Sequence, residues 1–360
     1  MKKIKLFDPV INHNEEQEIR KILHSGFWAS GSGIGNVSKF EIEFKKYVKS
    51  DECIAVNSGT SALNLSLSLF NLENSEIILP SMTFVSTAHA IVLNKAKPIF
   101  ADVDPQTLCL DINDVKKKIT KKTKAIVPVH FGGMPCNLNG ILEICEKFNL
   151  KLIEDAAHAS GTKYGKRKIG SHGNAVCFSF HPVKNLAMPT GGLIAINDRN
   201  HKQIKKILNS RRWCGITNRK NFFYDVKEIG TNYYMNEFSA GIGRIQLRNL
   251  DKMNTKRKQI AQKYEKDICI DEKIPYSRDC SYHIYWILVK NRNYFMKKML
   301  ENGVETGIHY NPVHSFSMYK SKTKLPITEK IAKNIVSIPI HPNLSSKEIE
   351  KIINLVNKFS

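Results

Sequence analysis

Strand-like and helix-like segments alternate from about residue 15 to residue 200, and this alternation restricts the fold more than any other feature of the chain. Strands that alternate with helices are typical of a mostly parallel sheet that is covered on both faces. In such sheets a ligand binds beyond the carboxyl ends of the strands. We therefore expect an α/β protein whose functional residues follow strand ends. The expected strands are 53–57, 76–80, 97–103, 124–131, 151–155, 175–180 and 191–197, and the expected helices are 15–24, 61–70, 84–94 and 139–149.

The second part of the chain begins with a long helical pattern and then returns to alternation. A chain of 360 residues suits one large domain and a smaller one. We expect a large domain over 1–250, including the N-terminal helical segment, and a small α/β domain over 251–360. A helix at 235–267 is long enough to connect the two domains. The expected elements of the small domain are strands at 282–290 and 304–310, a helix at 293–303, and a terminal helix at 345–359 with Ser345 or Ser346 as its N-cap.

Composition excludes several classes of protein. The net charge of +22 could indicate a nucleic-acid partner, but the lysines are spread along the chain and lack interleaved aromatic residues. The densest basic run, 114–125, is typical of a solvated helix and loop. No apolar run approaches the roughly 20 residues that span a bilayer, and no apolar segment follows the basic N-terminus. The eight cysteines contain no CxxC pair, which favours reduced thiols in the cytoplasm and no metal site.

Two glycine-containing segments could contact phosphate. The sequence GSGIG at 31–35 lacks the G-x-G-x-x-G spacing and follows no strand, so we interpret it as a loop and exclude a dinucleotide-binding dehydrogenase. The sequence NSGTSAL at 57–63 joins an expected strand to an expected helix through Gly59. Free N–H groups at a helix N-terminus, with the hydroxyls of Thr60 and Ser61, form an anion cradle. A plain helix cap by Ser58 or Thr60 explains the same residues equally well.

Three further residues suggest a cofactor. Asp155 ends an expected buried strand, where it is either a ligand-binding carboxylate or an N-cap, and His158 follows it. Lys184 lies between an apolar run and a Pro-Thr-Gly-Gly turn. A partly buried lysine has a lowered pKa, and its neutral amine can form a Schiff base with an aldehyde. An anion cradle, an acid at the edge of a sheet and such a lysine are the groups that pyridoxal 5′-phosphate (PLP) requires.

Motifs over nearly the whole chain resemble the DegT/DnrJ/EryC1/StrS family of PLP-dependent sugar aminotransferases. The order of the motifs matches as well as their content, which makes the series highly specific. The resemblance implies a type I aminotransferase-like fold. The motifs are SGTSAL (58–63), TFVSTAHAI (83–91), FADVDP (100–105), VPVHFGGMPCNL (127–138), IEDAAHASG (153–161), FSFHPVKNL (178–186), GTNYYMNEFSAGIGRIQL (230–247), GIHYNPVH (307–314) and SIPIHPNLS (337–345).

The resemblance also implies roles for individual residues. Lys184 matches the Schiff-base lysine, and Asp155 matches the acid that keeps the pyridine nitrogen protonated. The remaining assignments concern the ring, the phosphate and the sugar nucleotide. Phe84 and His158 match positions beside the ring, and the phosphate site is matched by Gly59, Thr60, Ser61 and Ser179. Asn232 matches a residue that contacts the phosphate of the neighbouring subunit. The matches to residues that contact the sugar nucleotide are His309, Tyr310 and His314.

The implied reaction is a transfer of the amino group of L-glutamate to a nucleotide-linked keto-sugar. Pyridoxamine phosphate forms between the two half-reactions, and active sites shared between subunits make a homodimer necessary. A 4-keto-6-deoxy sugar is the expected acceptor; a 3-keto sugar, or a non-catalytic regulator with this fold, is the alternative. Tyr234 replaces an arginine that is frequent in the family, and AMPTGG at 187–192 departs from the usual turn, so the sugar is the open part of the prediction.

Overall fold

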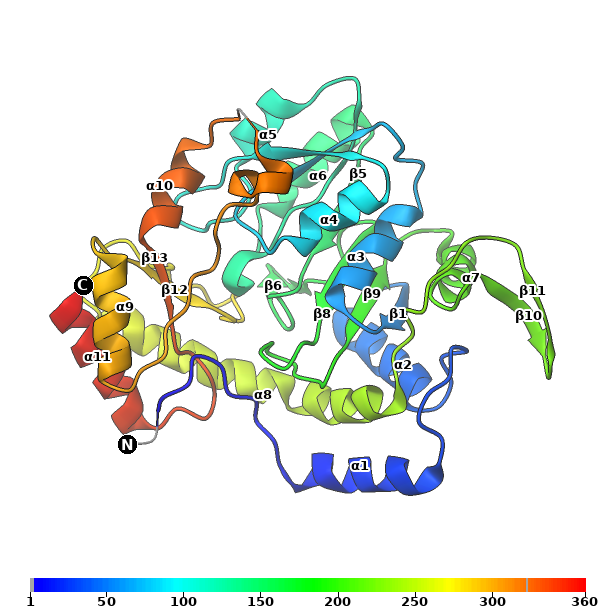
Figure 1. Ribbon diagram of the computed structural model, residues 1–360, viewed down its shortest axis with the longest axis horizontal. Helices are drawn as coiled ribbons and strands as arrows, with labels where there is room; N and C mark the ends of the chain where they lie inside the picture. The colour runs from blue at the N-terminus through cyan, green and yellow to red at the C-terminus, as the bar shows by residue number, and fades with distance from the viewer. Residues whose placement is uncertain (1–2, 322) are drawn as a thin grey trace.

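A seven-stranded sheet forms the centre of the computed structural model, which describes residues 3–321 and 323–360 (Figure 1). Strand β9 runs antiparallel to both of its neighbours, and the other adjacent strands pair in parallel. The expected mostly parallel sheet is therefore confirmed. In spatial order the strands are β1 (Glu52–Val56), β9 (Gly192–Ile196), β8 (Ala175–Ser179), β5 (Lys151–Asp155), β4 (Thr123–Ile126), β2 (Glu76–Pro80) and β3 (Lys97–Ala101).

Helices cover both faces of this sheet. Alternate residues of each strand belong to two different apolar clusters, as Ile54 and Val56 do on one face and Cys53 and Ala55 on the other. Burial on both faces explains why the strands read as continuous apolar runs. One face packs against α3 (Gly59–Ser68), α4 (Ser86–Leu93) and α7 (His201–Arg211), and the other against α2 (Asn36–Val48), α5 (Ile112–Lys118) and α6 (Leu138–Phe148).

A smaller α/β unit follows at the C-terminal end. Its two strands pair antiparallel, and its last helix begins with a capping box between Ser345 and Glu348, as the sequence predicts for Ser345. The elements are β12 (Tyr285–Leu288), α9 (Arg292–Glu301), the short 3₁₀ turns η2 (Val313–Ser315) and η3 (Ser317–Tyr319), α10 (Pro326–Asn334), β13 (Ile335–Ile338) and α11 (Ser346–Phe359).

The expected strand at 304–310 is wrong. Only single residues of this segment make strand-like pairs, Val304 with Ile4 and Gly307 with Ser337. After Gly307 the chain leaves β13, and His309 and Tyr310 line a cavity beside the large sheet.

Helix α8 (Glu237–Asp267) is the longest helix and connects the two parts of the molecule (Figure 1). It begins at the N-cap Asn236, whose side chain accepts a hydrogen bond from the Ser239 N–H. The expected boundary between 250 and 251 falls within this continuous helix. Helix α1 (His13–Ser25) packs against α8, and Ile4 pairs with Val304, so the start of the chain lies against the C-terminal unit.

A two-stranded hairpin, β10 (Ile216–Lys220) and β11 (Phe223–Val226), projects beyond α7 (Figure 1). Its tip is apolar and exposed: Phe222 and Phe223 expose 92% and 82% of their surface. The other small elements are the strand pair β6 (Lys163–Tyr164) and β7 (Arg167–Lys168) and the turn η1 (Phe131–Gly133). Within the described residues no helix is both long and apolar enough to cross a membrane.

Candidate active site

A cavity of about 330 Å³ lies beyond the carboxyl ends of β5 and β8, where the sheet topology predicts a ligand. Strand ends, the first residues of α3 and α4, and the segment after Gly307 contribute its walls. It brings together most of the residues that the sequence predicts for a site. These are Gly59, Thr60, Phe84, Asp155, His158, Ser179, Lys184, His309 and Tyr310.

The N-terminus of α3 forms one end of the cavity. The side chain of Ser58 caps the helix by accepting a hydrogen bond from the Ser61 N–H at 3.1 Å. The first N–H groups of the helix, those of Gly59 and Thr60, have no intrahelical acceptor and carry the positive end of the helix dipole. A Cβ atom at Gly59 would lie only 2.7 Å from Cβ of Ser179, so only glycine lets these two segments of the chain approach each other so closely. The Ser58 cap is therefore present, and it leaves the N–H groups of Gly59 and Thr60 available to an anion.

Asp155 ends β5 and faces the cavity from a buried position. Its Oδ2 accepts a hydrogen bond from the Thr87 hydroxyl at 2.8 Å, and its Oδ1 accepts one from the Ala157 N–H at 3.1 Å. Burial raises the pKa of the Asp155 carboxyl, while these two hydrogen bonds and the charge of Lys184 act in the opposite direction. A carboxylate held in this way is suited to a cationic partner in the cavity.

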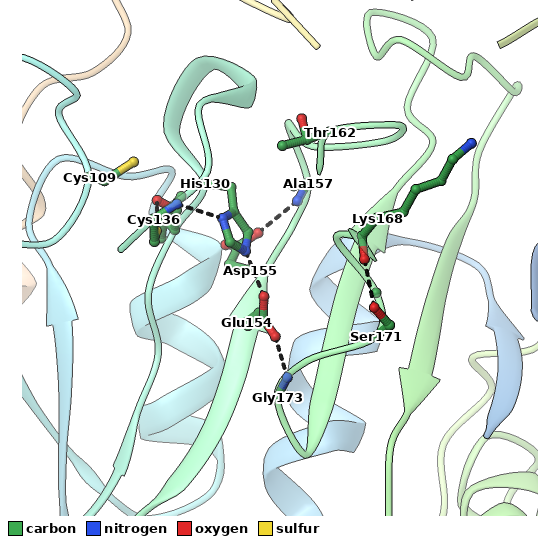
Figure 2. A network of polar contacts seen from close by, with 12 residues as sticks. Cys109, His130, Cys136, Glu154, Asp155, Ala157, Thr162, Lys168, Ser171 and Gly173 are labelled. Carbon is green, nitrogen blue, oxygen red and sulfur yellow. Dashed lines mark hydrogen bonds and ion pairs between the residues drawn. The ribbon is translucent and has the colours of Figure 1, made fainter. Parts of the chain in front are cut away.

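A buried series of hydrogen bonds fixes the backbone that carries Asp155 (Figure 2). The neighbouring side chain, Glu154, lies on the opposite face of β5, where its Oε2 is 2.8 Å from Nε2 of His130 and its Oε1 accepts the Gly173 N–H. The Nδ1 atom of His130 accepts the Cys136 N–H at 3.1 Å, so the ring hydrogen lies on Nε2 and is donated to Glu154. These contacts tie the end of β5 to the loops on either side.

Lys184 follows β8 and is half-buried in the cavity wall. Burial lowers the pKa of its amine to about 8, against an opposing effect of the Asp155 charge. At pH 7 about a tenth of the amine is therefore neutral, the form that a nucleophile requires. Its Nζ atom lies 3.4 Å from Nε2 of His283.

Aromatic rings surround the lysine. The ring of His158 is nearly parallel to that of Tyr310, with centroids 5.9 Å apart. A hydrogen bond of 3.0 Å joins Nε2 of His158 to the Tyr310 hydroxyl. Phe84 is 56% exposed and its ring lies 6.1 Å from that of Tyr310. Burial lowers the pKa of His158 well below its usual value and that of His309 to about 4, and the Lys184 charge lowers both further. Both imidazoles are therefore neutral at physiological pH.

Three of the predicted site residues do not line this cavity. The Ser61 hydroxyl is turned to Ser58 and Asn57, at 2.8 and 2.5 Å. Asn232 lies with Ser61 and Thr60 in an adjacent open hollow, on the outer side of the α3 N-terminus. His314 is buried against the hydroxyl of Ser81, at 2.6 Å from its Nδ1.

Two functional candidates were missed in the sequence. Thr87 reaches Asp155 from the first turn of α4, and the motif that contains it could have suggested a polar residue aimed at the cavity. His283 precedes β12 and is 99 residues from Lys184 in the chain, and nothing in its local sequence indicates this contact. Only the packing of the C-terminal unit onto the large sheet brings it there.

The residues of the cavity fit PLP. The cradle at Gly59 has the charge and the open backbone N–H groups for a phosphate, Asp155 has the charge for a protonated pyridine nitrogen, and the Lys184 amine suits the aldehyde. The closeness of Gly59 to Ser179, which leaves no room for a Cβ atom, also brings the Ser179 side chain beside the N-terminus of α3.

The sequence and fold match characterised proteins along their full length. A model of the DegT/DnrJ/EryC1/StrS aminotransferase family matches residues 9–357. GDP-perosamine synthase of Escherichia coli O157:H7 is 31% identical, with 100% of this chain and 99% of that protein covered. The structure of Helicobacter pylori PseC, an aminotransferase involved in the biosynthesis of pseudoaminic acid, has a TM-score of 0.93 at 25% identity, with 99% of each chain covered. The structure of S. venezuelae DesV in complex with a ketimine intermediate has a TM-score of 0.89 at 29% identity, with 96% and 93% covered.

Proposed function

Because the chain belongs to the DegT/DnrJ/EryC1/StrS aminotransferase family, we propose that it transfers the amino group of L-glutamate to a nucleotide-linked 4-keto-6-deoxy sugar. It is a PLP-dependent sugar aminotransferase, as its relatives and structural neighbours are. The observation that carries the proposal is the presence of Lys184, Asp155 and the Gly59 cradle in one cavity. GDP-perosamine synthase and PseC, similar along their whole length, support a nucleotide-sugar acceptor for amino-sugar biosynthesis.

Each residue has a separate task in this reaction. PLP, when bound, supplies an aldehyde for the amino group and a ring that accepts electrons. The N–H groups of Gly59 and Thr60 would hold its phosphate. Asp155 would keep a proton on the ring nitrogen, and its bonds to Thr87 and Ala157 fix the orientation of the carboxylate. Phe84 and His158 lie where they can cover the ring.

Lys184 would act twice. Its neutral amine would hold the aldehyde of the cofactor. Once an amino donor has taken its place, the freed Nζ atom would accept the proton from the donor Cα and release it again. The pKa of about 8 allows the amine to take and release a proton near neutral pH. The second half-reaction uses the same atom in the reverse direction, which predicts ping-pong kinetics.

A homodimer with shared sites is part of the proposal. The apolar hairpin tip at 222–223 is exposed to a degree that is unusual for large aromatic side chains and suits burial against a second copy. Asn232 lies outside the cavity of its own chain, in the hollow beside Thr60, which is consistent with a contact to a phosphate held between two chains. The free thiols of all eight cysteines suit a reducing cytoplasm.

The decisive assay incubates the PLP-loaded protein with L-glutamate and a panel of UDP-, dTDP- and GDP-linked sugars. The panel contains 4-keto-6-deoxy sugars and 3-keto sugars, and mass spectrometry detects the amino sugar and 2-oxoglutarate. We expect amination of a 4-keto-6-deoxy sugar, and none by the Lys184→Ala variant. Amination of 3-keto sugars alone would replace the acceptor in this proposal. Binding of PLP without any conversion by glutamate or another amino donor would favour a regulator.

A further inference from the structure

Lys184 has a neighbour that the proposed mechanism does not use. The imidazole Nε2 of His283 lies 3.4 Å from Lys184 Nζ, and the side chain is 3% exposed. The distance is long for a hydrogen bond, but contacts at catalytic groups are often long before substrate binds. An ammonium group can only donate hydrogen bonds, so Nε2 accepts while Lys184 is charged.

Packing fixes the plane of the His283 ring. The Phe7 ring stacks on it with centroids 5.3 Å apart and planes 20° apart, and the His158 ring lies 4.6 Å away. Phe7 comes from the N-terminal segment, which is held to the C-terminal unit through Ile4 and Val304. Two segments that are distant from His283 in the sequence thus hold this imidazole edge toward the lysine, and neither the stacked Phe7 ring nor the tilted His158 ring competes for Nε2.

Burial and the charges nearby keep the His283 imidazole neutral, so that it can accept a hydrogen bond. Burial lowers the pKa of His283 well below its usual value, and the nearby charges of Lys184 and Arg257 lower it further. A neutral imidazole has one free acceptor nitrogen. Its other nitrogen, Nδ1, is buried and has no partner among the described residues, so no carboxylate turns this histidine into a proton relay.

We propose that His283 is a positioning residue that anchors the amine of Lys184 whenever this amine is not attached to the cofactor. The inference rests on the proposed role of Lys184. The freed amine must stay beside the reacting carbon while it takes one proton from the donor Cα and delivers it to the cofactor. The Nε2 atom accepts a hydrogen bond from Nζ throughout, takes up no proton, and limits the rotation of the long lysine side chain.

The test uses three substitutions that separate the acceptor atom from the packing. His283→Phe keeps an aromatic ring but removes the acceptor. His283→Gln can place its amide oxygen near the position of Nε2, whereas His283→Asn carries its amide near the position of Nδ1 only. Thermal unfolding of each variant shows whether the fold is retained, and the Gln variant is the matched control.

The first readout needs no cofactor and no substrate. The apo proteins are methylated with formaldehyde and cyanoborohydride across a range of pH, and peptide mass spectrometry gives the rate at Lys184. In the native protein the rate should rise with a midpoint near pH 8. Loss of a hydrogen bond to the charged amine lowers its pKa, so we expect the midpoint to fall by about half a unit or more in the Phe and Asn variants. The Gln variant should stay near the native midpoint.

Other titratable groups also face this amine, and they are unchanged in all variants. They are Asp155, His158, His181 and His309.

The second readout is turnover of the loaded enzyme. The Phe and Asn variants should lose about tenfold or more in kcat with little change in the KM for glutamate, and the Gln variant should recover most of the loss. An unchanged or raised midpoint in the Phe variant would overturn the proposal, as would equal effects of all three substitutions, because packing alone would then explain them. If native Lys184 instead failed to attach PLP, the proposed function would fail, while the comparison of midpoints would still decide the contact with His283.

Discussion

The hydroxyl of Thr87 lies 2.8 Å from Oδ2 of Asp155, so a side chain on the first turn of α4 orients the acid at the end of β5. We expect Thr87→Val to raise the pKa of Asp155 further above its usual range, because the variant removes a bond to the charged form. In the proposed mechanism Asp155 acts as a carboxylate, so activity should fall as pH drops through its pKa. The acid limb of the kcat profile should therefore move to higher pH, with kcat lower by about tenfold.

Thr87→Ser is the control for this substitution because it keeps the hydroxyl. Its pH profile should match that of the native enzyme. If the Val variant kept the native acid limb, the hydrogen bond to Asp155 would have no role in holding the charge.

Gly59 is the position at which the phosphate cradle is most sensitive to substitution. A Cβ atom there would lie 2.7 Å from Cβ of Ser179, so Gly59→Ala must separate the α3 N-terminus from the end of β8. We expect PLP affinity to fall by roughly tenfold to a hundredfold, as for the loss of a charge-assisted hydrogen bond. Equilibrium titration of the apo protein with PLP measures this. Gly140 lies in the first turn of α6, and a Cβ atom there would have its nearest contacts at 3.4 Å. Gly140→Ala should therefore bind PLP with the native affinity.

Burial of the Lys184 amine should destabilise the apo protein at neutral pH. The folded pKa of about 8 lies below the usual 10.5, so the unfolded chain binds more protons between these values and stability rises with pH there. The penalty is fully present below pH 8. We expect Lys184→Met to be more stable than the native apo protein by about 2 kcal/mol at pH 7, with the gap narrowing toward pH 10. Urea unfolding at both pH values tests this, and a gap that widens with pH would contradict it.

The hairpin of β10 and β11 should be required for assembly. Replacing both Phe222 and Phe223 by serine removes the most exposed aromatic surface of the tip. We expect sedimentation to show a shift from the proposed dimer toward monomer, with a parallel loss of activity because we propose that the two chains share their active sites. Leu300→Ser, an exposed apolar residue on α9 in the C-terminal unit, is the control and should leave the assembly unchanged. A fully dimeric and active double variant would remove the hairpin from the interface.

Local patterns in the sequence predicted the large sheet well because its strands are buried on both faces. The bounds of β2 and β5 match the expected strands at 76–80 and 151–155, and the Ser345 cap matches as well. The hairpin at 216–226 was not predicted, because an exposed strand pair lacks the apolar alternation of a half-buried one. Helix α2 was also missed, since it follows the glycine-rich stretch at 31–35 that indicates a loop.

The cavity was predictable to the extent that its residues follow strand ends or begin helices. Asp155, Gly59 and Lys184 all have such positions, and the sheet topology brings them together. The hydroxyl of Ser61 was expected in the cradle but is used within the α3 cap. The contact of His283 with Lys184 depends on how the C-terminal unit docks, which no local periodicity encodes.

If Lys184 carries the cofactor, borohydride reduction should attach PLP permanently to this lysine. The purified protein is loaded with PLP, reduced with borohydride, digested and analysed by peptide mass spectrometry, beside Lys184→Ala treated in the same way. We predict a visible absorption band that reduction abolishes, and a phosphopyridoxyl group on the peptide that contains Lys184. The variant should show neither. A modification on another lysine, or an equal absorption band in the Lys184→Ala protein, would show that Lys184 does not carry the cofactor.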